Sequence, residues 1–385
     1  MSESRHPQEA ATAGSATSGR TFIDVLQHGN RELFHSAMVA WFLDPGAEHS
    51  LGDRFLRSFA ERIRPVGSAA RAALLAAVAP TVRTEVHAHR GRYDIEVSCG
   101  DSRVVIENKT KSVGDPTQLD RYKGEQTHVI ALGLCEASYD QNVRGDYPVM
   151  TYQSVLDVLD DLHPAGSEWA VLANHYRAFL RRELCLLAAV RACYEQGDLS
   201  RDAEIAAALA DERLYSENDV RFLHLVMLQY FSEYLATRPV WRGTEWSLDK
   251  NMRSGVWLAN FRHLPGGFTF SQPIQQAIGD TGAGLWFHVE LWRGLGLRAR
   301  SWDDVAGCLQ LRCYAKGRDP ASVRERFQQA YEIGQSEAWT ARTKKSSETY
   351  FLVRRELKKS EFVFGSLEAA LRSFMAGFGS FAGLA

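Results

Sequence analysis

The sequence predicts an α/β domain with a mixed central sheet flanked by helices, followed by a helical segment and a C-terminal α+β domain. Apolar residues at helical spacing near the start give way to four apolar, strand-like runs within residues 82–134. A strongly helical pattern then begins at residue 169, and short aromatic strands follow Pro239. Since the chain has 385 residues, more than one domain is expected.

Changes in composition give the expected boundaries. Residues 1–20 are polar, rich in Ala, Ser, Thr and Gly, and lack an apolar signal core, which predicts a disordered tail and a cytoplasmic protein. The α/β core is expected over 21–165, the helical segment over 166–238 and the C-terminal domain over 239–385. No apolar run approaches the ~18 residues that span a bilayer, so no membrane partner is expected.

The elements of the core follow from periodicity and from helix start and stop signals. Asn30 is a plausible N-cap for a helix with a broad apolar face, and Asp44-Pro45-Gly46 ends that helix. The expected elements, in chain order, are helices over 22–43 (broken near Gly29-Asn30), 51–63 and 69–79, strands over 82–89, 93–98 and 103–109, a helix over 116–124, and strands over 127–134 and 148–152.

The later elements are read in the same way. Helices are expected over 169–194, 203–210, 220–235, 321–332 and 367–375, and strands over 257–261, 286–292, 310–314 and 350–354.

Composition and charge are those of a soluble globular protein. Apolar residues make up 45% of the chain and charged residues 24%. The formal net charge is −2, so binding to nucleic acid would depend on local basic patches rather than on overall charge. The six cysteines form no C-x-x-C pair, which favours reduced thiols over zinc sites or disulfides.

A charged β-hairpin is the most informative feature. Gly100-Asp101 suits a two-residue turn between two strands. Counting outward from that turn places Cys99 opposite Ser102, Glu96 opposite Val105, and Asp94 opposite Glu107. Alternation then puts Asp94, Glu107 and Lys109 on one face. Tyr93, Ile95, Val97, Val104, Ile106 and Asn108 are expected on the other face, mostly as core.

Two opposed carboxylates repel each other, and a bound divalent cation would explain their placement. Magnesium takes oxygen ligands, commonly one or two carboxylates with water and a substrate phosphate. Lys109 would then lie beside the ion, where it can orient the attacking water or stabilise charge on the phosphate. The alternative from these three residues alone is a hairpin with a solvated charged face.

The order of motifs around this hairpin resembles the PD-(D/E)XK nuclease superfamily, which has the restriction-endonuclease-like fold. The motif is carried by Tyr93-Asp94, Glu107-Asn108-Lys109, and Gln118 with Tyr122. The run from Glu32-Leu33-Phe34-His35-Ser36 to His49-Ser50-Leu51-Gly52-Asp53 is similar to the start of a stand-alone, bacterial-type branch. The resemblance covers roughly residues 22–160. Tyr93 stands where the family usually has proline, a departure that removes no ligand.

The resemblance implies a role for each matching residue. Asp94 and Glu107 would bind Mg²⁺, with Mn²⁺ as a substitute, helped by the backbone carbonyl of Asn108. Lys109 would be the catalytic lysine. Glu32 matches an acidic position that completes the metal site or supports it. Gln118 and Tyr122 would approach the site or the nucleic-acid backbone.

Several polar residues leave two interpretations open. Glu32, His35, Ser36 and Val39 share a helical stripe that faces either a cavity or solvent. Glu85 is either an extra acid or an edge charge. His87 and His89 lack further ligands for zinc and are expected to be structural. Asp44 and His49 are expected to organise a loop rather than to act in catalysis.

Basic residues near the hairpin are the expected phosphate contacts. Together with Tyr122, the nucleic-acid-binding set comprises Arg92, Lys111, Arg121 and Lys123. The expected function is a metal-dependent nuclease that hydrolyses phosphodiester bonds of DNA, and a role in phage defence or restriction follows by analogy. The alternatives are a nucleic-acid-binding or regulatory module on an inactive nuclease scaffold, and a different enzyme or interaction scaffold. A homodimer is left open.

Overall fold

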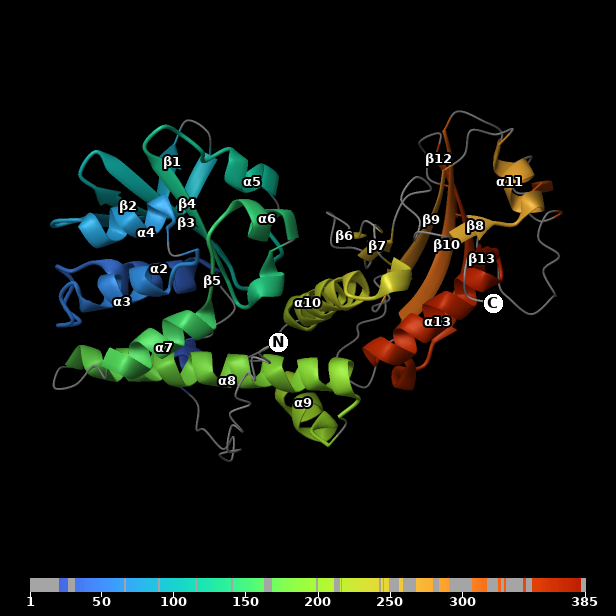
Figure 1. Cartoon of the computed structure of the whole chain (residues 1–385). Coiled ribbons are helices and arrows are strands. Elements are labelled where there is room, and N and C mark those ends of the chain that lie inside the picture. The colour runs from blue at the N-terminus through green and yellow to red at the C-terminus, as the bar shows by residue number, and fades with distance from the viewer. Residues whose placement is uncertain are drawn as a thin grey trace, which may run out of the picture.

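In the computed structural model, the described residues form two large sheets and one two-stranded sheet, and long helices join the two large sheets (Figure 1). The structure describes residues 21–26, 32–65, 67–88, 91–114, 116–139, 141–162, 168–198, 200–210, 215, 217–241, 244, 246–248, 256–258, 268–279, 284–290, 307–316, 325–326, 329, 342–343 and 348–381. The predicted N-cap Asn30, the tail over 1–20 and nearly all of the predicted helix over 321–332 lie outside these residues.

The N-terminal sheet is mixed and five-stranded, in the order β1-β2-β3-β4-β5. Its strands are β1 (Thr81–Ala88), β2 (Gly91–Cys99), β3 (Ser102–Lys109), β4 (Thr127–Gly133) and β5 (Val149–Thr151). β1, β2 and β3 pair antiparallel, whereas β3, β4 and β5 pair parallel. The predicted mixed sheet flanked by helices is therefore confirmed.

Helices cover both faces of this sheet. The first face carries α2 (Glu32–Leu43) and α4 (Ala69–Ala76), which contact β2 and β3, with α3 (Arg54–Arg62) packed on α4. Ile95, Val97 and Ile106 are fully buried in the large core cluster that includes residues of these helices. On the other face, residues of α5 (Pro116–Asp120) and α6 (Gln141–Asp146) form a smaller cluster with Val105 and Val129.

The hairpin register is the predicted one from the turn to the Ile95–Ile106 pair, but the predicted pairing of Asp94 with Glu107 is not formed in the ladder. Cys99 pairs with Ser102 and Glu96 with Val105, and the paired positions end at Ile95 and Ile106. Gly100 has a φ of +63°, a left-handed conformation that glycine adopts without a side-chain clash.

The predicted face of Tyr93 was wrong. Its ring packs edge-on against Tyr122, with ring centroids 5.0 Å apart, in the cluster that contains Val105. Tyr93 still pairs with Val86 of β1, but the β1–β2 pairing skips Glu85 and Asp94, and Glu85 has a φ of +54°. Strict alternation is therefore interrupted between Ile95 and Tyr93. The helix expected over 116–124 is also shorter than predicted, since it ends at Asp120.

The predicted helical segment is confirmed, and it packs on both halves of the chain. The 29-residue helix α8 (Glu168–Gln196) contacts α7 (Tyr152–Leu162), α1 (Phe22–Leu26), α9 (Asp202–Leu209) and α10 (Glu217–Ala236). Figure 1 shows α8 running along the lower side of the molecule, and α10 between the two sheets. α10 contacts the 3₁₀ turn Glu136–Ser138 on one side and β6 and β7 on the other.

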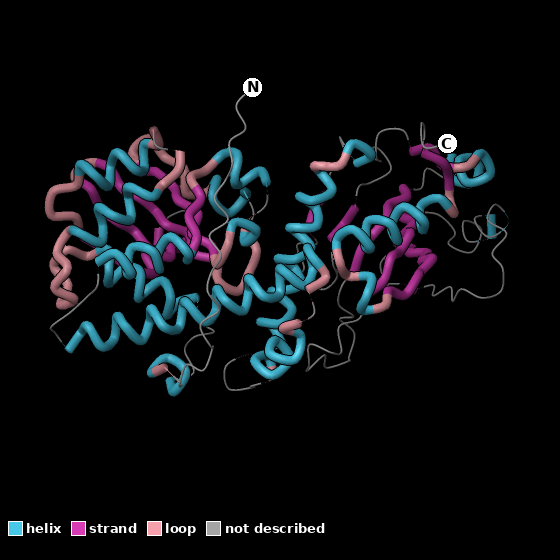
Figure 2. Tube along the Cα trace, turned by 60° about the horizontal axis from the view of Figure 1, so that its bottom comes forward, coloured by secondary structure: helices cyan, strands magenta, loops and turns pink. Residues whose placement is uncertain are grey.

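The C-terminal part contains further small sheets and helices, visible on the right in Figure 2. Its main sheet is antiparallel, in the order β11-β12-β10-β9-β7-β6. These strands are β6 (Trp246–Leu248), β7 (Val256–Leu258), β9 (Gly284–Glu290), β10 (Gly307–Lys316), β11 (Arg342–Thr343) and β12 (Glu348–Leu357).

The remaining elements of this part are β8 (Phe268–Phe270) paired with β13 (Gly379–Phe381), α11 (Gln272–Gly279), α13 (Phe364–Ala376), and the 3₁₀ turns Pro239–Trp241 and Lys359–Glu361. Phe374 of α13 packs edge-on against Phe287 of β9, so α13 covers one face of the main sheet. Among the described residues, none of the helices combines the length and apolar character needed to cross a membrane.

Candidate active site

Asp94 leaves the regular ladder and binds the backbone of the neighbouring strand. Beyond the Ile95–Ile106 pair, its Oδ2 accepts a hydrogen bond of 2.8 Å from the backbone N–H of Asn108. The carboxylate therefore takes the place of a backbone acceptor at the open end of the hairpin. This bond fixes Asp94 beside the strand that carries Glu107 and Lys109.

Glu107 is almost completely buried, with 1% of its surface exposed. Its Oε1 lies 2.5 Å from Nζ of Lys109 and accepts a hydrogen bond from the side-chain amide of Gln118. Its Oε2 is buried and has no hydrogen-bond partner among the described residues. Leaving a buried carboxylate oxygen without a partner costs free energy, so this atom is a natural position for a cation.

The ammonium group of Lys109 lies between two oxygen acceptors. Besides Oε1 of Glu107, it donates to the backbone carbonyl of Asn108 at 3.3 Å. The Asn108 carbonyl, which the family resemblance implies as a metal ligand, therefore lies near the Glu107 carboxylate, since both contact the same ammonium group. The prediction that Glu107 and Lys109 share a face of the sheet is borne out by this contact.

Burial and mutual charge shift the pKa values of these three groups. Burial raises the pKa of the Glu107 carboxyl to about 7; the Lys109 ammonium offsets part of this rise, and the Asp94 carboxylate adds to it. Burial also raises the pKa of Asp94, against the opposing effects of Lys109 and the Asn108 N–H. For Lys109, burial favours the neutral amine, but the nearby carboxylates outweigh it and raise the pKa.

The side chain of Asn108 connects the site to α2 and α7. It is fully buried, and its amide donates to Oγ of Ser36 at 3.0 Å and to the backbone carbonyl of Glu32 at 3.3 Å. Its own Oδ1 accepts a hydrogen bond of 3.0 Å from the hydroxyl of Tyr152. Sequence reasoning gave Asn108 only a backbone role, because its side-chain partners lie far away along the chain.

Glu32, the first residue of α2, binds the segment that follows β3. Its Oε1 accepts from the backbone N–H groups of Thr110 and Lys111, each at 3.2 Å, and from the hydroxyl of Ser112 at 2.8 Å. The solvent-facing interpretation of the stripe through His35, Ser36 and Val39 was wrong. All three side chains are buried, and His35 hydrogen-bonds the Tyr176 hydroxyl at 3.0 Å.

Gln118 and Tyr122 approach Glu107 from the face of the sheet opposite to the one that α2 covers. The amide of Gln118 donates to Glu107 and, at 3.4 Å, to the hydroxyl of Tyr122. That hydroxyl donates in turn to the backbone carbonyl of Arg92 at 3.0 Å. Tyr139 adds a contact that the sequence did not indicate, since its hydroxyl donates to the backbone carbonyl of Glu107 at 2.7 Å.

The predicted basic residues have different surroundings. Arg121 is exposed, and Arg92 is half exposed and pairs with Glu85 at 2.8 Å. Lys123 is exposed and pairs with Asp120 at 2.8 Å. Lys111 differs from the others: its ammonium group lies 2.9 Å from Asp219 of α10, and its side chain is only 17% exposed.

Four of the five remaining candidates lie among the described residues. Asp44 and His49 form a loop network, in which Asp44 accepts from the N–H of Gly46 at 2.9 Å and His49 accepts from the N–H of Leu51 at 3.0 Å. Glu85 has a φ of +54°, and its Oε1 is buried without a hydrogen-bond partner among the described residues. His87 is exposed on β1, and His89 lies outside the described residues.

The donor set fits one hard cation with additional water ligands. In the described part of the chain, no three side chains of His, Cys, Asp or Glu form a metal-binding group. Two carboxylates and a backbone carbonyl are a sufficient protein contribution for Mg²⁺, which retains several waters. The partnerless Oε2 of Glu107 supplies the observation that favours an ion here.

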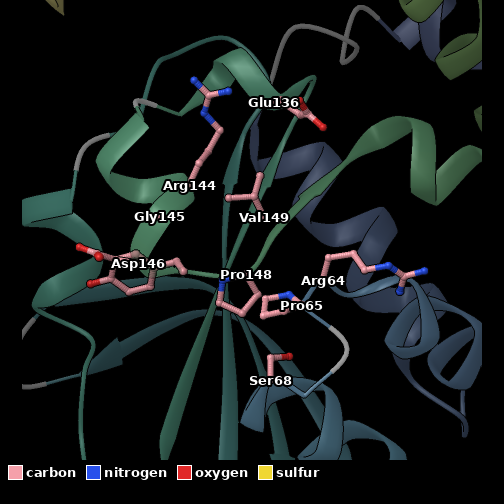
Figure 3. Close-up of a pocket in the computed structure, with 10 residues that line it drawn as sticks. Arg64, Pro65, Ser68, Glu136, Arg144, Gly145, Asp146, Pro148 and Val149 are labelled. Carbon is pink, nitrogen blue, oxygen red and sulfur yellow. The ribbon is translucent and has the colours of Figure 1, made fainter. Parts of the chain in front are cut away.

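A separate cavity of about 590 Å³ lies beside β5, between the loop before α4 and α6 (Figure 3). Its two arginines, Arg64 and Arg144, point in different directions and do not converge on one position. Its ten lining residues include none of the predicted site residues, so the cavity is distinct from the acidic pair.

Comparison with known proteins agrees with this geometry. The family model described as the PD-(D/E)XK nuclease superfamily matches residues 21–169. No significant match was found among curated proteins or among solved structures. The matched region contains the whole five-stranded sheet and every residue of the acidic site. Over residues 21–169, the chain is therefore similar to the PD-(D/E)XK nuclease superfamily.

Proposed function

We propose that the protein is a metal-dependent nuclease that hydrolyses phosphodiester bonds of DNA. The observation that supports this best is the convergence on Glu107. A buried carboxylate with one partnerless oxygen lies beside an ammonium group, a second carboxylate and a backbone carbonyl. An apolar sheet would gain nothing from such a group, because buried charges are costly unless a partner compensates them.

Asp94, Glu107 and the carbonyl of Asn108 would hold Mg²⁺, for which Mn²⁺ would substitute. When bound, such an ion polarises the phosphodiester and offsets its negative charge. Glu32 would support the site rather than bind the ion through Oε1, because that oxygen already accepts hydrogen bonds from Thr110, Lys111 and Ser112.

Lys109 and Gln118 would act on the reacting groups. The raised pKa of Lys109 keeps its side chain charged at neutral pH, so that it can stabilise charge on the phosphate or orient the attacking water. Gln118 would hold the carboxylate of Glu107 in place, and its amide can also reach the hydroxyl of Tyr122.

The substrate backbone would approach across the exposed basic residues near α5. Arg92, Arg121 and Lys123 are accessible and would contact phosphates. Tyr122 is buried, so it would support this surface through its hydrogen bond to the Arg92 carbonyl. Lys111 would not contact the substrate backbone. Its charge is already matched by Asp219, and its side chain is directed toward the helical segment.

The test is cleavage of plasmid, linear duplex, single-stranded DNA and RNA in the presence of Mg²⁺ or Mn²⁺. We expect DNA cleavage that chelation abolishes and that Asp94→Ala and Lys109→Ala each reduce by at least about 100-fold. Asp101→Asn, at the exposed turn of the same hairpin, is the matched control and retains activity. Cleavage that survives in both Asp94→Ala and Lys109→Ala, with the fold intact, refutes the proposal. Salt-sensitive binding without turnover indicates the inactive scaffold instead.

A further inference from the structure

The three residues after the proposed catalytic lysine are held from one side by α2. Thr110, Lys111 and Ser112 direct two N–H groups and one hydroxyl at the same oxygen of Glu32. Because Thr110 directly follows Lys109 in the chain, the position of this segment affects where the Lys109 side chain begins.

The same segment is also held by the helical segment. Nζ of Lys111 lies 2.9 Å from Asp219 of α10 and 4.0 Å from Glu183 of α8. Asp219 is 3% exposed and Glu183 8%. The pair is therefore largely shielded from water, where ionic interactions are stronger and more directional than at the surface.

Further contacts keep Glu183 in place. Its Oε1 accepts from the hydroxyl of Tyr215 at 2.6 Å and lies 3.4 Å from Arg182. Arg182 forms two hydrogen bonds of 2.6 Å with Asp24 of α1. Helices α1, α8 and α10 thus jointly support the site that receives the Lys111 ammonium.

Simple attachment of helices to the sheet does not require this arrangement. Apolar side chains of similar size would attach the helices as well as a buried ion pair, or better. What an ion pair adds is a fixed position for the charged group. Here that group belongs to a residue two positions after Lys109.

We infer that Asp219 and Glu183 are positioning residues for Lys109, acting through Lys111. Both lie outside residues 21–169, so a part of the chain beyond the family-matched region completes the site. The kinetic part of this inference rests on the proposed nuclease activity. The structural part, the fixing of residues 110–112, does not depend on it.

The test uses the full chain with Asp219→Asn. We expect kcat for DNA cleavage to fall about tenfold with KM changed less than about twofold, since misplacement of a reacting group affects the chemical step more than binding. In the same variant, the amides of Thr110 and Lys111 exchange their hydrogens faster. Asp219→Glu, which keeps the carboxylate, restores most of the rate and the protection.

Glu233→Gln is the matched control. It removes another ion pair of α10, the 2.5 Å contact with Arg144 of α6, which does not touch residues 110–112. We expect this variant to leave kcat and the exchange of the 110–112 amides unchanged. An equal effect in Glu233→Gln would overturn the inference, because it would show only a general loosening of α10.

Two outcomes separate this inference from the proposed function. If the wild type cleaves no nucleic acid, the proposed function fails, and amide exchange alone decides whether Asp219 fixes the segment. Unchanged exchange at Thr110 and Lys111 in Asp219→Asn overturns the inference whether or not the protein cleaves. Should Asp219→Asn fail to fold, Lys111→Met carries the same test.

Discussion

At the scale of single residues, Glu107 has the environment that most constrains the chemistry. Burial raises the pKa of its carboxyl to about 7, above the ordinary value of 4.5, and the effect of Lys109 only partly opposes this. A metal ion would bind the ionised carboxylate, so the metal ion and the proton compete for Glu107.

This competition predicts pH-dependent metal affinity. The affinity for Mg²⁺ should rise with pH until about pH 7 and then level off, and binding at lower pH should release a proton. Calorimetric titration in two buffers with different ionisation enthalpies measures that proton. Glu107→Gln should lose both the affinity and the proton release. An affinity that is constant from pH 5.5 to about 8 would contradict the assignment.

The same pKa shift predicts the pH dependence of folding without metal. The folded protein binds the Glu107 proton more tightly than the unfolded chain, so this group stabilises the fold below about pH 4.5. That contribution is lost as the pH rises through about 7. Urea unfolding in the presence of a chelator should show a smaller loss of stability over this range in Glu107→Gln than in the wild type.

At the scale of elements, α2 is attached to β3 by buried polar groups in addition to apolar packing. Asn108 alone joins Ser36 and the Glu32 carbonyl of α2 to the Tyr152 hydroxyl of α7. Removing it leaves polar atoms of Ser36 and Tyr152 buried without this partner, which costs more than the lost hydrogen bonds themselves.

Asn108→Ala should therefore lower the free energy of unfolding by about 3 kcal/mol. Chemical denaturation measures this loss, with Asp101→Ala at the exposed hairpin turn as a control that changes stability by less than about 0.5 kcal/mol. A loss of less than about 1 kcal/mol in Asn108→Ala would mean that water replaces the missing amide.

Elements with local signals were predictable from the sequence, and contacts between distant segments were not. The Gly100 turn and the alternation around it gave the β2–β3 register, and with it the shared face of Glu107 and Lys109. The direction of Tyr93 was missed because the β1–β2 pairing is interrupted at Glu85 and Asp94, which no local sequence pattern indicates. The partner of Lys111 was missed because Asp219 lies on a helix far along the chain, which no local pattern indicates.

At the scale of the whole molecule, the core of the family-matched region continues into the helical segment. Tyr176 of α8 is fully buried, hydrogen-bonds His35 and packs against Phe34 and Phe42 of α2. The core domain expected to end at residue 165 therefore leaves part of its apolar surface for α8 to cover. Exposing buried aromatic side chains costs roughly 1.5–3 kcal/mol each.

Truncation should show this dependence directly. A chain of residues 21–169 should aggregate or unfold without a cooperative transition, whereas residues 21–238, which retain α8 and α10, should unfold cooperatively. Thermal unfolding and size-exclusion chromatography distinguish the two cases. Cooperative unfolding of the shorter chain near the wild-type temperature would show that the helical segment is not needed.

A crystal structure with Mn²⁺ at about pH 8 tests most directly whether a divalent cation binds between Asp94 and Glu107. We predict an anomalous peak at this position, bound by both carboxylates and the Asn108 carbonyl at distances close to the ~2.1 Å typical of Mg²⁺. An empty position with Lys109 still bound to Glu107, at a Mn²⁺ concentration that occupies other sites on the protein, would contradict this prediction.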